Sequence, residues 1–206
     1  MSDKHSSPLL IVVSAPSGGG KTTLCEQLLA KHPSMTRAVT CTTRPPREGE
    51  QDGVAYYFLD AGSFLKRVQA GNFLEHATVY GNSYGILKSE VLTKLRQGKD
   101  VLLNIDVQGA ATVREKAAED EEIKRALVSV FLTTATFSEL EERLKRRGQD
   151  SNATIQKRLS VARQEIAQWK HFDYLLISTT IQEDLRRMQA IIEAEKMRQC
   201  RAHLLD

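Results

Sequence analysis

The sequence lacks the features that mark membrane, secreted and nucleic-acid-binding proteins. Its longest uninterrupted apolar run, Leu9 to Val13, is far shorter than the roughly 20 residues that a membrane-spanning helix needs. The three cysteines, Cys25, Cys41 and Cys200, are widely spaced and form no CxxC pair, which argues against a disulfide framework or a zinc site and predicts reduced thiols. Lys and Arg exceed Asp and Glu by only three, 29 against 26, so no nucleic-acid partner is indicated. We therefore expect a cytoplasmic protein with no membrane partner and no obligate protein partner.

The remaining composition is that of an ordinary globular protein, with 41% hydrophobic and 27% charged residues in 206. Buried-strand patterns, rich in β-branched and apolar residues, alternate with helical patterns. We expect strands at 9–13, 101–105, 126–132 and 174–177, and helices at 24–31, 108–118, 137–147, 153–170 and 182–198. This order predicts one α/β domain with a doubly wound, mostly parallel sheet flanked by helices. Between Arg37 and Gly85 the sequence pattern changes to that of short strands, turns and one helix near 63–69, which predicts an inserted mixed α+β lobe.

A glycine-rich segment follows the first strand and precedes the first helix, in the context of a P-loop. It ends in Gly20-Lys21-Thr22, the decisive end of that motif, although Ala15 replaces the usual first glycine. Backbone N–H groups and the helix N-terminus favour phosphate, Lys21 can reach the β and γ phosphates, and the Thr22 hydroxyl can ligate Mg²⁺. The alternative is a glycine-rich helix cap with no nucleotide. The residues expected to bind ATP are Ala15, Pro16, Ser17, Gly18, Gly19, Gly20, Lys21, Thr22 and Thr23.

A second basic segment contains Arg44-Pro45-Pro46-Arg47, two guanidiniums on a stretch stiffened by proline. Arginine forks bind phosphate bidentately, so the segment is suited to a phosphate clamp. A polyproline ligand for another protein, or a solvated basic turn, is equally compatible with the composition.

Several motifs in order make the resemblance specific. Pro-Arg-x-Gly-Glu at 46–50 is followed by Asp52-Gly53-x-x-Tyr56-x-Phe58, by Gly81-Asn82-x-Tyr84-Gly85 and by Asp106-x-Gln108-Gly109. Together with Arg147-Gly148 and Arg158-Leu159, this order resembles the guanylate kinase family from the P-loop to about residue 160. The resemblance implies a P-loop NTPase core at 8–37, 95–142 and 160–206, a GMP-binding lobe at 38–94 and a helical lid at 143–159, all within a single domain spanning 1–206.

The resemblance also implies the roles of individual residues in Mg²⁺-dependent phosphoryl transfer from ATP to GMP, and to dGMP. Catalytic roles fall to Lys21, Arg44, Arg147 and Arg158, and the metal ligand from the protein is Thr22. GMP would be bound by Thr40, Arg44, Arg47, Tyr56, Glu75, Tyr84 and Asp106. The chemistry of Glu75 agrees with a role in guanine recognition. Guanine presents N1–H and its 2-amino group as adjacent donors, and a carboxylate can accept both, whereas adenine has an acceptor at N1.

Three positions depart from the family's pattern. Asn104 stands where an Asp is common, so an outer-shell role toward Mg²⁺ would pass to Asp106. Ile86 replaces a hydroxyl residue that would bond the guanine carbonyl, which predicts looser selectivity. Ser178-Thr179-Thr180 replaces an expected Asn-Asp pair and leaves recognition of the donor base open.

Two other readings stay open at this point. Guanylate-kinase-like folds also serve as scaffolds that bind phosphorylated peptides, although the intact Lys21 argues for a triphosphate site. A kinase for another nucleoside monophosphate is opposed mainly by Glu75.

Overall fold

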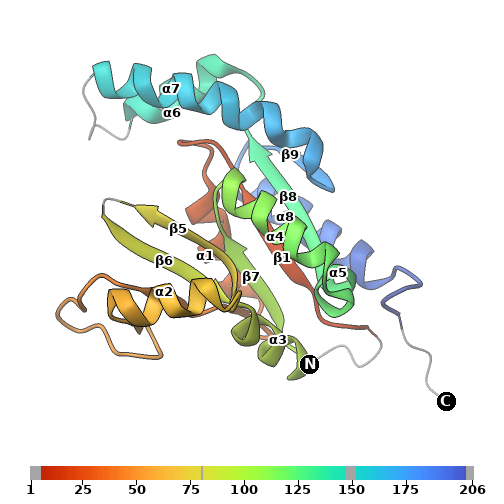
Figure 1. The fold of residues 1–206 in the computed structure, drawn as a ribbon. Coiled ribbons are helices and arrows are strands. Elements are labelled where there is room, and N and C mark those ends of the chain that lie inside the picture. Colours follow the sequence, from red (N-terminus) through yellow and green to blue (C-terminus); the bar gives the residue numbers. More distant parts are fainter. Residues whose placement is uncertain (1–5, 80, 147–151, 203–206) are drawn as a thin grey trace.

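The core of the molecule is a five-stranded parallel sheet (Figure 1). The structure is a computed structural model that describes residues 6–79, 81–146 and 152–202, without the side chains of 152 and 153. The strand order is β2-β7-β1-β8-β9. The strands are β1 (Leu10–Ser14), β2 (Met35–Arg37), β7 (Asp100–Asn104), β8 (Leu127–Thr133) and β9 (Tyr174–Ile177).

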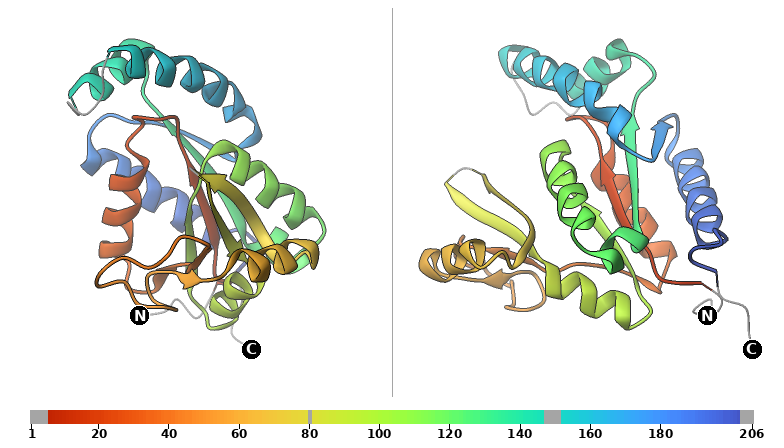
Figure 2. Two further views of the ribbon diagram at one scale, coloured as in Figure 1. Left: turned by 60° about the vertical axis from the view of Figure 1, so that its left-hand side comes forward. Right: turned by 45° about the vertical axis from the view of Figure 1, so that its right-hand side comes forward.

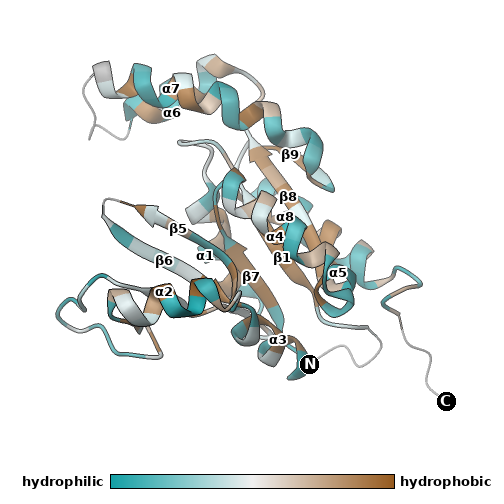
Figure 3. Ribbon diagram, viewed as in Figure 1, coloured by the Kyte–Doolittle hydropathy of each residue, from teal (hydrophilic) through white to brown (hydrophobic). Residues whose placement is uncertain are grey.

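Helices cover both faces of this sheet because the central strand is apolar on both sides. In and just before β1, Leu9, Ile11 and Val13 belong to one buried cluster, and Leu10 and Val12 belong to another. The first cluster is completed by α1 (Lys21–Lys31) and α8 (Ile181–Lys196). The second is completed by α3 (Lys88–Arg96), α4 (Val107–Ala118) and α5 (Glu121–Ala126). The brown strands between partly teal helices in Figure 3 show this arrangement, which confirms the predicted doubly wound α/β core.

A second, smaller sheet forms the inserted lobe. Its order is β4-β3-β6-β5, and the strands are β3 (Thr40–Thr42), β4 (Tyr57–Phe58), β5 (Phe73–Val79) and β6 (Asn82–Leu87). β3 pairs with β4 in parallel, and the other pairs are antiparallel. Helix α2 (Ala61–Gln69) covers one face through a small cluster of Cys41, Phe64 and Phe73.

Two helices lie across the carboxyl ends of β1 and β8, on the side from which the lobe also projects (Figure 2). They are α6 (Phe137–Arg146) and α7 (Asn152–Ala167), and a 3-10 turn, η1 (Gln168–His171), follows. Their contact is apolar and is made by Leu140, Leu144, Ile155, Leu159 and Ala162. Both helices therefore pack as one unit above the sheet.

The sequence patterns placed most elements correctly but missed two helices on the second face of the sheet. Helix α5 includes Ala126, so the strand expected from 126 begins at Leu127 instead. Asp120 caps this short polar helix by accepting the N–H groups of Glu122 and Ile123, at 3.0 and 3.1 Å. The other missed helix is α3, and the helix expected to reach 170 ends at Ala167. Within the described ranges, no helix is long and apolar enough to cross a membrane.

Candidate active site

The glycine-rich segment forms a tight loop between β1 and α1. Gly18 and Gly20 have φ angles of +89° and +91°, which L side chains rarely adopt, and Gly20 is the N-cap residue immediately before α1. The Gly19 N–H donates to Pro16 O at 2.9 Å and closes a turn. Glycines at these positions are thus required by the backbone, and the loop lies at the carboxyl end of the central strand, where open α/β sheets bind ligands.

Lys21, the first residue of α1, is directed toward the neighbouring strand. Its Nζ donates to Ile105 O at 2.6 Å, and the same oxygen accepts the Ser14 hydroxyl at 2.8 Å. Burial lowers the pKa of Lys21, while Asp106, Cys25 and Glu165 act in the opposite direction. Thr22 and Thr23 follow and are exposed on the first turn of α1.

The donors available for a metal fit a magnesium ion that arrives with a nucleotide. Within the described ranges, no three His, Cys, Asp or Glu side chains are placed to hold a metal on their own. Mg²⁺ prefers six oxygens and commonly takes them from phosphates, waters and one or two protein groups. The exposed Thr22 hydroxyl at the start of α1 suits the protein's share of such a site.

A cavity of about 230 Å³ lies between the lobe and the carboxyl end of β7. It is lined by four of the residues expected to bind GMP: Thr40, Glu75, Tyr84 and Asp106. Strand register explains part of this grouping, because Thr40 on β3 pairs with Ile86 on β6, which pairs with Glu75 on β5. Paired residues share a face of the sheet, so these three form one row across the lobe. Ile86 occupies the middle of that row and is buried.

Glu75 is the buried carboxylate of this cavity, with 8% of the residue exposed. A β-bulge between Phe73 and Glu75 shifts the register of β5 just before it. Burial raises the pKa of Glu75 to about 7, and the nearby Asp106 adds to the shift. Asp106 itself caps α4 by accepting the Gly109 N–H at 2.8 Å. The cavity therefore holds a carboxylate in water-poor surroundings. Its two oxygens can accept hydrogen bonds from two adjacent N–H donors of a bound molecule.

Arg44, Tyr56 and Tyr84 come together beside the cavity. The Arg44 guanidinium lies 5.4 Å from the centroid of the Tyr56 ring, and the Tyr56 and Tyr84 rings are 6.2 Å apart. Glu50 accepts two hydrogen bonds from Arg44 Nη2 at 2.8 and 2.9 Å, which raises the pKa of Arg44, with a smaller contribution from Tyr84. The guanidinium is thereby charged and held in a fixed orientation.

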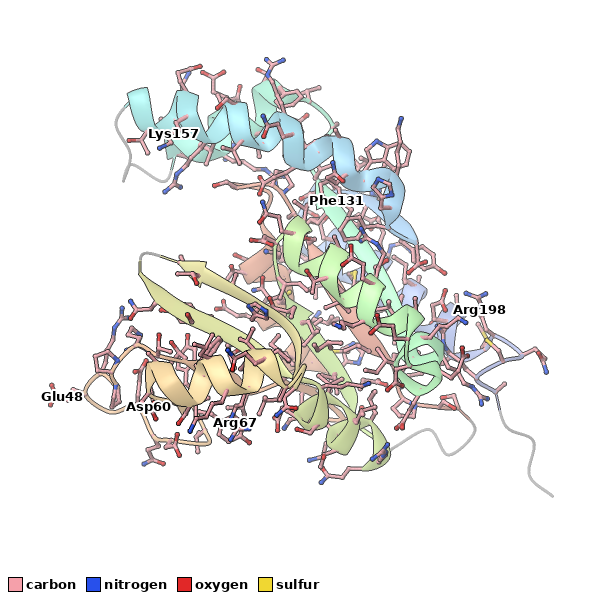
Figure 4. The ribbon with its side chains drawn as sticks, in the orientation of Figure 1. Glu48, Asp60, Arg67, Phe131, Lys157 and Arg198 are labelled. Atoms are coloured by element: carbon pink, nitrogen blue, oxygen red, sulfur yellow. The ribbon has the colours of Figure 1, made fainter. Side chains whose placement is uncertain are left out.

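The remaining expected arginines lie outside this cluster. Arg47 is exposed beside Glu48, which Figure 4 shows at the outer tip of the lobe. Its backbone N–H donates to Glu50 Oε2 at 2.8 Å, and its carbonyl accepts the Glu50 N–H at 3.1 Å. Arg158 is partly buried on α7, in the layer of helices above the sheet. Arg147 lies outside the described residues.

The structure adds residues to which the sequence analysis had assigned no part in binding GMP. Arg37 and Asn104 line the same cavity as Glu75, and Glu50 orients Arg44. Glu50 belongs to the Pro-Arg-x-Gly-Glu pattern, so its pairing with the nearby Arg44 could have been predicted from the sequence. Arg37 carried no signal, because only the pairing of β2 with β7 brings it to the cavity.

Near the start of α1, Arg143 connects α6 to the end of β9. Its Nη1 donates to the Ser178 hydroxyl at 3.0 Å, and a side chain at Gly20 would approach the same nitrogen within 3.7 Å. Ser178 in turn donates to the buried Asp184 at 2.6 Å, and Asp184 also accepts the Thr179 N–H. A carboxylate on α8 thus supplies an acidic group behind Ser178-Thr179-Thr180, which the sequence pattern alone did not indicate.

Comparison with known proteins agrees with this geometry. The guanylate kinase family model matches residues 7–195. A guanylate kinase of Clostridium perfringens is 40% identical over 195 residues, covering 95% of this chain and 87% of that protein. A guanylate kinase of Alkalilimnicola ehrlichii is 43% identical over 189 residues, covering 92% and 90%. The crystal structure of guanylate kinase from Anaplasma phagocytophilum, 31% identical, superposes with a TM-score of 0.69 over 96% of this chain and 90% of that one. The chain therefore belongs to the guanylate kinase family.

Proposed function

We propose that this chain transfers the γ-phosphoryl group of ATP to GMP, and to dGMP, giving ADP and the nucleoside diphosphate. The observation that carries the proposal is the cavity lined by the buried Glu75 and by Tyr84, with the Arg44 guanidinium beside it. Ile105 also lines this cavity, and its carbonyl accepts the bond from Lys21 of the phosphate loop. Membership of the family makes the chain a nucleoside monophosphate kinase. We place it in the cytoplasm, in accord with its free thiols at Cys25, Cys41 and Cys200.

On the donor side, the loop from Ala15 to Thr23 would hold the ATP phosphates. Its backbone N–H groups and the start of α1 favour negative charge, and Lys21 can exchange its bond to Ile105 O for a phosphate oxygen. Thr22 would supply the protein ligand to Mg²⁺. When bound, that ion neutralises charge that develops on the transferred phosphoryl group.

On the acceptor side, the base and the phosphate of GMP would be bound by different parts of the lobe. Glu75 would accept N1–H and the 2-amino group, with Thr40 and Asp106 along the same cavity wall. Arg44, with the hydroxyls of Tyr56 and Tyr84, would bind the phosphate, and the exposed Arg47 would approach it from the lobe tip.

Catalysis then depends on positioning and charge, because phosphoryl transfer needs little covalent chemistry from the protein. Lys21 and Arg44 would flank the migrating group from the two sides. Arg158 on α7, and Arg147 after α6, would add positive charge from above the sheet and help to exclude water.

A coupled assay of ADP release across GMP, dGMP, AMP, UMP and CMP tests the proposal. We expect turnover with the two guanine nucleotides and a loss of roughly 100-fold or more in kcat for Lys21→Ala, the size typical of a lost transition-state donor. Arg44→Ala should raise KM for GMP by roughly 10- to 100-fold, since hydrogen bonds between charged groups contribute about 1.5–3 kcal/mol. The exposed Arg186, which pairs with Glu183, offers a matched control in Arg186→Ala.

Absence of turnover with GMP would refute the proposed phosphoryl transfer. If the protein instead bound a phosphorylated peptide, a scaffold function would be favoured. Equal turnover with AMP would refute the role of Glu75.

A further inference from the structure

A carboxylate of α7 contacts the phosphate loop directly. Glu165 Oε2 accepts the backbone N–H of Ser17 at 3.3 Å, across 148 residues of sequence. Glu165 is half-buried near the end of α7. Burial raises its pKa, whereas the bond from Ser17 N–H and the nearby Lys21 act in the opposite direction and favour the carboxylate.

In this contact, the Glu165 carboxylate accepts a loop N–H as a phosphate oxygen would. The N–H groups of such loops bind anions, and a carboxylate oxygen is an anionic acceptor of the same kind. Lys21 is close enough to Glu165 for the carboxylate to raise its pKa, and its Nζ bonds Ile105 O. A protein anion thus lies at the position that the proposed function gives to the triphosphate.

The surroundings allow this contact to be exchanged. Helix α6 lies directly on the loop, because a side chain at Gly18 would come within 3.0 Å of Leu144. Helix α7 is joined to α6 by their apolar cluster, but a cavity of about 460 Å³ separates α7 from α4. Glu165, Gln164 and Val161 line that cavity from α7, so the carboxylate has open space beside it.

Helix geometry connects Glu165 with one of the proposed catalytic arginines. Arg158 precedes Glu165 by seven residues on α7, which is about two helical turns, so the two side chains leave the same face of the helix. A shift of Glu165 relative to the loop therefore changes the position of Arg158 relative to the same loop.

We propose that Glu165 is a positioning residue that occupies the phosphate loop when no donor is bound and is displaced by the phosphates of ATP. Its displacement links donor binding to the placement of α7 and Arg158. The inference rests on the loop being the donor site, as proposed above. Both anions cannot hold the same N–H, and two anions close together repel each other.

Binding of the ATP analogue AMP-PNP with Mg²⁺, measured by calorimetry, tests the competition. Glu165→Gln keeps the size and removes the charge, so we expect Kd to fall about fivefold, a modest electrostatic gain. The exposed Glu142 on α6 supplies a control, because Glu142→Gln changes net charge equally and should leave Kd unchanged. An unchanged or higher Kd in Glu165→Gln overturns the proposal.

Two further measurements separate the possible failures. The sequence has one tryptophan, Trp169, which lies four residues after Glu165 and is 41% exposed. Its emission should change when AMP-PNP binds the unaltered protein, and Glu165→Gln without nucleotide should already show part of that change. Identical emission of the two nucleotide-free proteins contradicts displacement. Loss of AMP-PNP binding in Lys21→Ala confirms the donor site whatever Glu165→Gln does, whereas unaltered binding there refutes the donor site itself.

Discussion

At the scale of single residues, Glu75, which is proposed to bind guanine, also titrates near neutral pH. The pKa of Glu75 is raised to about 7 by burial and by Asp106, so both protonation states are populated near neutral pH. Only the ionised carboxylate accepts two N–H donors without offering one of its own. Guanine recognition should therefore change with pH around neutrality.

We expect kcat/KM for GMP to rise with pH through about 7 and then to level off. The GMP phosphate itself titrates near pH 6, so the step assigned to Glu75 has to be identified by its loss in Glu75→Gln. A pH profile of the two proteins, with KM for ATP measured alongside, makes the comparison. A step near pH 7 that survives in Glu75→Gln would contradict the assignment.

The same shift predicts the effect of Glu75→Gln on stability. Because the folded-state pKa is raised above the ordinary 4.5, the native state favours the protonated carboxyl, and stability is lost as pH rises from about 4.5 to about 7. At pH 8 Glu75→Gln should unfold with a free energy higher by about 3 kcal/mol, at 1.4 kcal/mol per pKa unit. Urea denaturation at pH 5 and pH 8 should show the difference between the two proteins growing with pH.

At the scale of elements, the row of site residues in the lobe depends on one close packing contact. Gly85 lies between Tyr84 and Ile86 on β6, and a Cβ there would approach the Phe73 ring within 2.8 Å and His76 Cβ within 3.0 Å. Phe73 also stacks on Phe64 of α2, with ring centroids 4.5 Å apart. The ring cannot move away without disturbing the packing of α2.

Gly85→Ala should therefore distort the lobe and cost about 1–3 kcal/mol, the usual size of overpacking. KM for GMP should rise while the affinity for AMP-PNP is kept, since the phosphate loop lies on the core sheet. Gly62→Ala in α2 is the control, because Gly62 has an ordinary φ and an added Cβ would approach only Asp60 Oδ1, at 3.2 Å. Gly49→Ala would not serve, because Gly49 has a φ of +81°. Equal effects of Gly85→Ala on both substrates would argue against a separate acceptor lobe.

At the scale of the whole molecule, an ion pair between the buried Asp100 and the partly exposed Lys196 joins α8 to the amino end of β7, away from the site. Asp100, 4% exposed at the start of β7, accepts Lys196 Nζ at 2.8 Å and the Leu9 N–H at 2.9 Å. These bonds join the first strand, the middle of the chain and its last helix. Removing the carboxylate leaves the partly exposed Lys196 ammonium and the buried Leu9 N–H without this acceptor.

Asp100→Ala should destabilise the protein by about 1–3 kcal/mol, the usual cost of leaving a buried donor without its acceptor. At a temperature where the variant is still folded, kcat should stay near that of the unaltered protein, because the pair lies at the amino ends of the strands. The exposed pair Lys116 and Glu119 is the control, and Glu119→Ala should cost less than 1 kcal/mol. A change in Asp100→Ala as small as that of the control, in a urea titration, would contradict this account.

Elements with local signals could be predicted from the sequence. The apolar run at Leu9 to Val13, the glycines at 18 and 20, and the helical repeat after Lys21 predict strand, loop and helix, because periodicity and backbone freedom are properties of neighbouring residues. The motifs from Arg44 to Arg158 indicated the family for the same reason, since each is a short run. Helix α5 escaped because its six residues repeat no apolar pattern and its stability comes from the Asp120 cap and from packing.

Which distant groups meet depends on the tertiary fold and could not be predicted from short segments. Strand pairing brings Thr40, Ile86 and Glu75 into one row, and the packing of β5 on α4 places Asp106 near Glu75 and so raises its pKa. The contact of Glu165 with Ser17 likewise depends on how α7 lies over the sheet. Burial and charge proximity arise from packing across the whole chain, and no short segment encodes them.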